Sequence, residues 1–199
     1  MRIITGKARG TKLFALEGEA TRPTSERAKE AIFSMINFDL EGREVLDLFA
    51  GSGQLGLEAA SRDAKHVTMV DNSKAAVEII NRNVEKTKLG EFCTVIRSDY
   101  NDFLRGRRTK VQYDIVLLDP PYAQKLVPSA LEGLLNGGFL KPTTIIVCET
   151  AEDGDVFGSR SALKNSFKVI KNTHYGIAHV TLLMPKDSEE AESEAEDGE

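Results

Sequence analysis

The chain has 199 residues, of which 41% are hydrophobic, a length and composition that fit one globular domain and exclude a wholly disordered chain. No apolar run approaches the length of a membrane-spanning helix, and the N-terminus lacks the apolar stretch of a signal peptide, so we expect a cytoplasmic protein. The net charge of −5 belongs to residues 186–199, which hold eight acids and one lysine and leave a net charge of +2 for residues 1–185.

The first 40 residues predict a small basic extension that is part of the same globule as the rest of the chain. Residues 2–14 fit a hairpin that turns at residues 6–10, and Pro23 and Thr24 mark the start of a helix. Residues 1–31 carry a net charge of +3, which permits contact with a polyanion. The candidate phosphate contacts are Arg2, Lys7, Arg9 and Lys12.

Strand-like and helix-like segments then alternate from residue 44 to residue 184, a pattern that predicts an α/β sheet. Apolar runs lie at 45–49, 67–70, 94–96, 115–118 and 144–148, and most of them are rich in valine and isoleucine, as is typical of buried parallel strands. Helices are expected between these runs, at 55–62, 73–86 and 125–135.

The last two strand-like runs, 167–175 and 178–184, are separated by only two residues. This spacing allows a hairpin but no crossover helix, so the last strand is expected to be antiparallel. We therefore predict a mostly parallel, seven-stranded, Rossmann-like sheet over residues 41–185, in the variant typical of methyltransferases. Residues 186–199 are expected to form a disordered acidic tail.

A glycine-rich turn joins the first strand to the next helix. Gly51, Gly53 and Gly56 match the pattern GxGxxG, in which glycine permits a tight turn and a close approach of a ligand to the backbone. The pattern alone fits either a dinucleotide or S-adenosylmethionine. Asp47 at the end of the strand favours S-adenosylmethionine, because a carboxylate attracts its ammonium or sulfonium group and would repel a pyrophosphate.

Two further acids end or follow the second and third strands. The oxygens of Asp71 suit both hydroxyls of a ribose, and Asp99 suits the amino group of an adenine. Three carboxylates at successive strand ends predict a binding crevice at this edge of the sheet. The candidate cofactor-binding residues are Asp47, Phe49, Gly51, Gly53, Asp71, Asn72, Asp99 and Tyr100.

The fourth strand ends in Asp119-Pro120-Pro121-Tyr122, the candidate catalytic segment. Two prolines in series stiffen the turn, so Asp119 and the Pro120 carbonyl can accept both hydrogens of one NH2 group, and Tyr122 can stack on a flat base. Accepting these hydrogens returns electron density to a weakly nucleophilic amino nitrogen. An activated sulfonium methyl group then requires mainly alignment. The segment predicts methyl transfer to the exocyclic amino nitrogen of a nucleic-acid base.

The sequence resembles the RsmD family, which methylates guanine N2 in bacterial small-subunit (16S) ribosomal RNA. The resemblance is carried by residues 2–10, 12–13, 22–24, 27, 47–53, 55–59 and 119–122. It implies that Asp119 to Tyr122 grip the guanine and that Arg22 and Arg27 line the mouth of the site as further RNA contacts. It also implies ribosomal RNA or an assembled small subunit as the partner of a chain that we expect to be a monomer.

Other functions remain open at this point. A DNA adenine-N6 or cytosine-N4 methyltransferase uses the same Asp-Pro-Pro-Tyr grip. A non-catalytic adenosyl-cofactor-binding module and an NAD-dependent oxidoreductase are further alternatives, against which Asp47 and the Asp-Pro-Pro-Tyr segment argue. Cys93 and Cys148 lie in separate apolar runs and form no cluster with histidine, so no metal site is expected.

Overall fold

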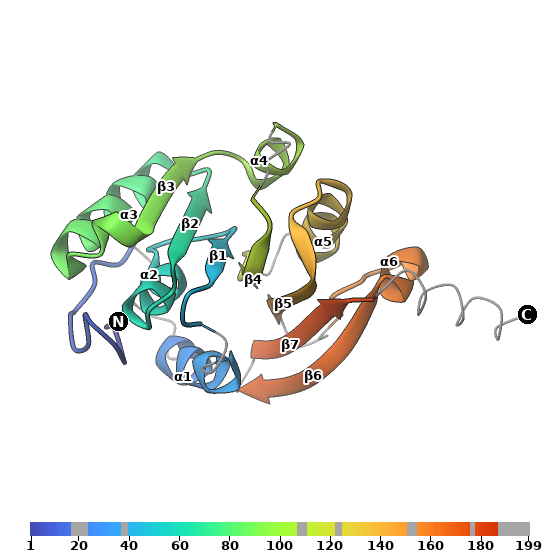
Figure 1. Ribbon diagram of the computed structural model, residues 1–199, viewed down its shortest axis with the longest axis horizontal. Helices are drawn as coiled ribbons and strands as arrows, with labels where there is room; N and C mark the ends of the chain where they lie inside the picture. Colours follow the sequence, from blue (N-terminus) through green and yellow to red (C-terminus); the bar gives the residue numbers. More distant parts are fainter. Residues whose placement is uncertain are drawn as a thin grey trace, which may run out of the picture.

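The computed structural model describes residues 1–16, 24–36, 40–106, 111–121, 125–150, 155–175 and 178–186. Helices and strands alternate along them (Figure 1), in the order α1 (Thr24–Ile36), β1 (Glu44–Asp47), α2 (Gln54–Ser61), β2 (His66–Asp71), α3 (Lys74–Thr87), the 3₁₀ turn η3 (Gly90–Phe92), β3 (Cys93–Arg97), α4 (Tyr100–Gly106), β4 (Tyr113–Leu118), α5 (Val127–Asn136), β5 (Leu140–Thr150), α6 (Ser161–Asn165), β6 (Phe167–Tyr175) and β7 (Ala178–Pro185).

All seven strands belong to one sheet in the order β3-β2-β1-β4-β5-β7-β6. The five strands β1 to β5 pair in parallel, whereas β7 is antiparallel to both β5 and β6. The predicted mostly parallel sheet and its antiparallel last strand are therefore confirmed. The strand order reverses between β1 and β4, which is the point where ligands bind in doubly wound sheets.

Helices cover both faces of the sheet, as Figure 1 shows. One core cluster joins α1, α2 and α3 to alternate residues of the strands, such as Val45 and Leu117. A second cluster joins α4, α5 and α6 to the residues that point the other way, such as Leu46 and Val116. This alternation on each strand explains why the strands are apolar on both sides and read as continuous hydrophobic runs.

Local signals account for several helix boundaries. Ser73 caps α3 as its side chain accepts a hydrogen bond from the backbone N–H of Ala76 at 3.3 Å, and Ile80 in that helix is fully buried. In α1, Ile32 and Ile36 are buried at helical spacing. Pro23 and the side chain of Thr24, expected to start this helix, lie outside the described residues.

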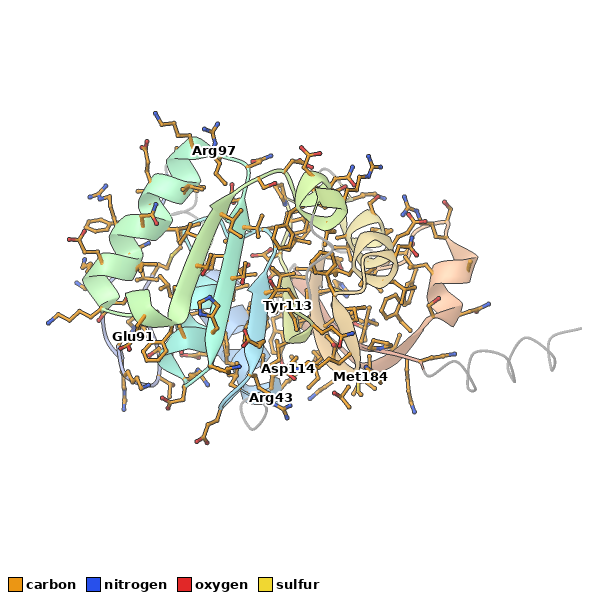
Figure 2. All side chains as sticks on the ribbon, turned by 45° about the horizontal axis from the view of Figure 1, so that its top comes forward. Arg43, Glu91, Arg97, Tyr113, Asp114 and Met184 are labelled. Carbon is orange, nitrogen blue, oxygen red and sulfur yellow. The ribbon has the colours of Figure 1, made fainter. Side chains whose placement is uncertain are left out.

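The amino edge of the sheet is fixed by the carboxylate of Asp114 (Figure 2). It accepts hydrogen bonds from Lys141 Nζ at 2.6 Å and from the backbone N–H of Glu44 at 2.9 Å, and it lies 3.4 Å from Arg43. Burial alone would raise the pKa of Asp114, but these hydrogen bonds and positive charges hold it below its ordinary value. The strands β1, β4 and β5 are thus tied together at the edge opposite their carboxyl ends.

The structure differs from the predicted elements in length and number. β5 begins at Leu140, before the predicted 144–148 run: Leu140 pairs with Tyr113, the register shifts before Ile145, and Thr144 donates a hydrogen bond to the Tyr113 carbonyl at 2.7 Å. The short helices α4 and α6 were not predicted. Both cysteines are free, and burial raises the pKa of each thiol.

The N-terminal hairpin is confirmed as one antiparallel bridge between Arg2 and Lys12, closed by a turn over residues 6–10. Gly6 adopts a φ of +83°, and a Cβ there would lie 1.7 Å from the carbonyl oxygen of Ser61, so only glycine fits. The acidic tail predicted at 186–199 lies outside the described residues except for Lys186. Among the described residues, no helix combines the length and the apolar character of a membrane span.

Candidate active site

A cleft of about 620 Å³ opens at the carboxyl ends of β1, β2 and β4, at the reversal of strand order. Both the predicted cofactor set and the predicted amino-binding corner contribute to its wall. The predicted residues that line it are Asp47, Phe49, Gly51, Asp71, Asn72, Asp99, Tyr100, Asp119 and Pro121. Gly53 and Pro120 do not line the cleft: Gly53 precedes α2, and Pro120 lines a smaller cavity beside it.

Asp47 is an almost fully buried acid at the end of β1. Its Oδ2 accepts a hydrogen bond from the backbone N–H of Gly56 at 2.9 Å, while its Oδ1 is buried and accepts none among the described residues. Burial raises the pKa of Asp47 to about 7, and the nearby Asp71 charge adds to the rise, while the hydrogen bond from Gly56 and the nearby backbone N–H of Phe49 oppose it. The cleft therefore has a wall acid that changes charge near neutral pH.

The glycines of the turn allow close packing behind the cleft. Gly53 adopts a left-handed φ of +78° where the turn enters α2. A Cβ on Gly56 would lie 2.6 Å from Cγ of Met69 and 3.2 Å from Oδ2 of Asp47. Any larger residue at Gly56 would push α2 away from β2, so the third glycine of the pattern serves helix–sheet packing.

Asp71 ends β2 and fixes the glycine turn. Its Oδ2 accepts a hydrogen bond from the backbone N–H of Gly51, and its Oδ1 accepts one from the N–H of Ser73, each at 2.8 Å. A carboxylate oxygen has two lone pairs, so both oxygens can still accept one hydrogen bond from a ligand. Asn72, the next residue, is exposed at the rim of the same cleft.

Two aromatic residues, Phe49 after β1 and Tyr100 at the start of α4, form one wall of the cleft. The rings of Phe49 and Tyr100 are 5.2 Å apart at an angle of 45°, and both residues line the cleft. Asp99 is exposed beside them and directly precedes α4, and its Oδ1 accepts a hydrogen bond from the N–H of Asn101 at 2.9 Å. Two rings and a neighbouring carboxylate fit a flat heterocycle that carries hydrogen-bond donors.

The Asp-Pro-Pro corner follows the fully buried strand β4. Leu117 pairs with Asp47 on β1, so Asp119 stands just beyond the buried acid at the same edge of the sheet. Asp119 and Pro121 both line the cleft. Tyr122, the predicted stacking residue, lies outside the described residues.

Sequence reasoning missed several residues of the cleft wall. Gln54 begins α2, lines the cleft and has a buried Oε1 that accepts no hydrogen bond among the described residues. Its position directly after the glycine turn, at a helix N-terminus, was an available signal. Leu16 comes from the N-terminal extension, and no local pattern marks it as a wall residue.

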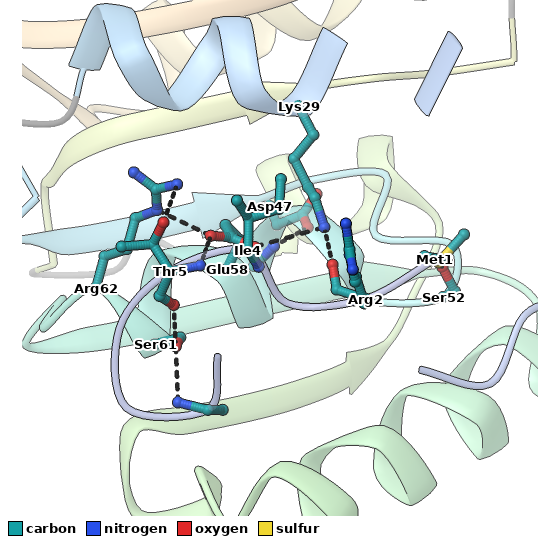
Figure 3. A network of polar contacts seen from close by, with 12 residues as sticks. Met1, Arg2, Ile4, Thr5, Lys29, Asp47, Ser52, Glu58, Ser61 and Arg62 are labelled. Carbon is teal, nitrogen blue, oxygen red and sulfur yellow. Dashed lines mark hydrogen bonds and ion pairs between the residues drawn. The ribbon is translucent and has the colours of Figure 1, made fainter. Parts of the chain in front are cut away.

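The extension is anchored to the sheet domain by a buried charge network (Figure 3). Glu58 on α2 is fully buried and accepts hydrogen bonds from the backbone N–H groups of Ile4 at 2.8 Å and Thr5 at 3.0 Å. Lys29 lies 3.4 Å and Arg62 2.9 Å from the same carboxylate. The buried negative charge is thus satisfied by two cations and two backbone donors.

Asn83 on α3 joins the extension to the glycine turn. Its Oδ1 accepts a hydrogen bond from the N–H of Phe14 at 2.8 Å, and its Nδ2 donates to the carbonyl oxygens of Phe14 and Ser52, each at 2.9 Å. Asn83 is fully buried. One side chain therefore fixes both the path of residues 14–16 into the cleft wall and the position of the turn.

The predicted phosphate contacts lie on the exposed surface of the extension: Arg2, Lys7, Arg9 and Lys12. Lys7 pairs with Asp63 at 2.8 Å and lies 4.4 Å from the ring centre of Phe92. Asp63 precedes β2 and Phe92 precedes β3, so Lys7 lies at the amino edge of the sheet, away from the cleft. Arg22 and the side chain of Arg27 lie outside the described residues.

The sheet order, with its single antiparallel strand β7 and its cleft at the reversal point, defines the class of Rossmann-like methyltransferases. The chain belongs to the family described as Conserved hypothetical protein 95, the RsmD family, which matches residues 1–184. It is therefore a methyltransferase.

Relatives in sequence and in structure agree with this class. "Ribosomal RNA small subunit methyltransferase D" of Haemophilus influenzae is 39% identical over 77% of this chain and 80% of its own length. The Escherichia coli protein of the same name is 33% identical, over 75% of this chain and 74% of its own length. A solved Haemophilus influenzae protein with methylase in its name has a TM-score of 0.77 and 32% identity, covering 94% of this chain and 99% of that one.

Proposed function

We propose that this chain transfers the methyl group of S-adenosylmethionine to the exocyclic N2 of a guanine in small-subunit (16S) ribosomal RNA. The observation that carries the proposal is that Asp119 and Pro121 line the same cleft as Asp47, Asp71 and Asp99. An amino-binding corner and a cofactor site must share one space for direct transfer. The names of the relatives, ribosomal RNA small subunit methyltransferase D, support the substrate class.

The polar groups of the cleft fit this cofactor. Asp47 Oδ1 and Gln54 Oε1 are buried acceptors without a hydrogen-bond donor among the described residues, and they suit the ammonium of the amino-acid end. The open lone pairs of Asp71 suit the ribose hydroxyls, and the Phe49–Tyr100 wall suits the adenine. When bound, S-adenosylmethionine supplies a methyl group activated by its sulfonium charge.

The corner residues act on the substrate. Asp119 and the Pro120 carbonyl accept the two hydrogens of the guanine amino group, which orients its nitrogen and raises its electron density. Prolines without N–H groups keep this arrangement rigid, so little ordering remains to be done when the base arrives. Stacking of the base on Tyr122 remains part of the proposal.

RNA contact is assigned to the basic extension. Arg2, Arg9 and Lys12 are exposed on it and can neutralise phosphates, and Lys7, which is paired with Asp63, lies at the amino edge of the sheet. We include a cytoplasmic location, a monomeric state, and either ribosomal RNA or an assembled small subunit as the partner.

The test is transfer of tritium from labelled S-adenosylmethionine into small-subunit RNA, whole small subunits and DNA in parallel, followed by nucleoside analysis. The proposal expects N2-methylguanosine from the RNA or the subunits. Label in N6-methyladenine or N4-methylcytosine of DNA would support the DNA alternative instead. Cofactor binding without transfer to any substrate would support a non-catalytic module.

A further inference from the structure

A second, smaller cavity of about 100 Å³ lies beside the Asp-Pro-Pro corner. It shares Pro121 and Leu126 with the cofactor cleft, so the two spaces meet at the corner. Most of its wall is apolar, and its polar residues are Glu149 and Thr150 at the end of β5 together with Lys125 and Asp155 from the neighbouring loops. We call it the corner cavity, and its defining residues are Pro120, Pro121, Leu126, Pro128, Glu149 and Thr150.

Thr150 supplies the polar feature that points to a ligand. It is the last residue of β5 and only 8% exposed, and it lines the corner cavity. Its Oγ1 is buried without a hydrogen-bond partner among the described residues. An unpaired buried hydroxyl destabilises the free protein, so a ligand atom that pairs with it gains a hydrogen bond that water does not already provide.

The sheet register sets Thr150 next to the substrate grip. Leu118, the last residue of β4, pairs with Cys148 on β5, and Pro120 and Thr150, each two residues further along the chain, both line the corner cavity. Neighbouring strands are about 4.8 Å apart. This separation is comparable to the width of the Watson–Crick edge of guanine, where the N2 amino group and O6 flank N1. If the residues that follow β4 hold the N2 amino group, the Watson–Crick edge of the guanine is long enough to place O6 at the end of β5.

We propose that Thr150 is a specificity-determining residue whose hydroxyl donates a hydrogen bond to O6 of the target guanine in the corner cavity. This inference rests on the proposed function, because it takes the N2 amino group to be held by Asp119 and the Pro120 carbonyl. The hydroxyl contacts O6, whereas Asp119 and the Pro120 carbonyl contact the N2 amino group. The contribution of Thr150 can therefore be measured separately with a base that keeps the 2-amino group and lacks O6.

The test compares RNA that carries guanine at the target position with RNA that carries 2-aminopurine, which keeps the 2-amino group and lacks O6. The measured quantity is the ratio of kcat/KM for the two RNAs. Wild type is expected to favour guanine roughly 10-fold, the value of one hydrogen bond. Thr150→Val, which keeps the shape and removes the hydroxyl, is expected to bring the ratio close to one by slowing guanine alone. Thr150→Ser is expected to keep the preference.

Thr181→Val is the matched control. Thr181 on β7 also has a buried, unpaired Oγ1 among the described residues, but it lines neither the cleft nor the corner cavity. Its loss is expected to leave the ratio unchanged. A preserved preference in Thr150→Val, or an equal loss on both RNAs, would overturn the role of Thr150 while leaving the proposed function standing. Failure of wild type to methylate guanine in any RNA would instead overturn the proposed function and, with it, this inference.

Discussion

Asp47 and Gly56 are joined by a hydrogen bond of 2.9 Å from the backbone N–H of the glycine to the buried carboxylate. The bond ties the end of β1 to the first turn of α2, directly behind the cleft. It uses one oxygen of the acid and leaves the other in the cleft wall. The Asp47 side chain therefore contributes both to the packing of α2 and to the wall of the cleft.

The close contact at Gly56 predicts that adding one methyl group there lowers the free energy of unfolding. Gly56→Ala would place its Cβ 2.6 Å from Met69, so we expect a loss of about 1–3 kcal/mol in the free energy of unfolding, measured by urea denaturation. Gly106→Ala is the control, because a Cβ at Gly106 meets nothing within 4 Å. Similar stability in the two variants would contradict the packing account.

The raised pKa of Asp47 predicts how stability changes with pH. Unfolded, the carboxyl loses its proton near pH 3.8, whereas in the folded protein it keeps the proton up to about pH 7. Between these values the folded state binds more protons, so the contribution of Asp47 is largest at low pH and falls by about 1.4 kcal/mol per pH unit as pH rises. Asp47→Asn should therefore become more stable relative to wild type from about pH 5 to pH 7 in urea titrations. A constant difference would rule out the raised pKa.

The same group predicts a pH dependence of cofactor affinity with the opposite sign. Only the charged form of Asp47 attracts the ammonium of S-adenosylmethionine, so affinity should rise by up to about tenfold per pH unit until about pH 7. Isothermal titration calorimetry checks this. The Asp47→Asn variant should bind more weakly and lose the rise, and a rise that persists in the variant would assign the effect to another group.

Asn83 predicts a link between the extension and the glycine turn. Asn83→Ala leaves the Phe14 backbone and the Ser52 carbonyl without their partner, so we expect a loss on the order of 2–4 kcal/mol in unfolding free energy. Weaker cofactor binding should accompany this loss, since Ser52 lines the cleft. Asn81→Ala, exposed on the same helix, should change neither quantity. Normal cofactor affinity in a destabilised Asn83→Ala would show that the two parts are not coupled.

The parts of the molecule that follow from local pattern were predictable. The β6–β7 hairpin follows from two strand-like runs two residues apart, and the capping role of Ser73 follows from the preference of helix starts for a hydroxyl. The helix α4 was not predictable, because its seven residues contain only Phe103 and Leu104 as buried positions, too few to show a helical period.

The site, too, has residues that local sequence pattern predicts and residues that it does not. Asp47, Asp71 and Asp119 were found because each ends or follows an apolar strand, where chain topology directs residues to one edge. Leu16 and Thr150 reach the site through the packing of distant segments. The double role of Asp71, which also holds the Gly51 backbone, depends on coordinates that no spacing of residues reveals.

Single-turnover methyl transfer by Asp119→Ala, with calorimetry of S-adenosylmethionine binding on the same sample, is the most direct measurement. Transfer to small-subunit RNA should fall by at least about 100-fold, comparable to losing one fixed polar contact to a reacting group, while cofactor affinity stays close to wild type. Asp102→Ala, which removes an exposed acid on α4, should transfer normally. Near-normal transfer by Asp119→Ala would contradict the assignment of the corner as the grip on the amino group.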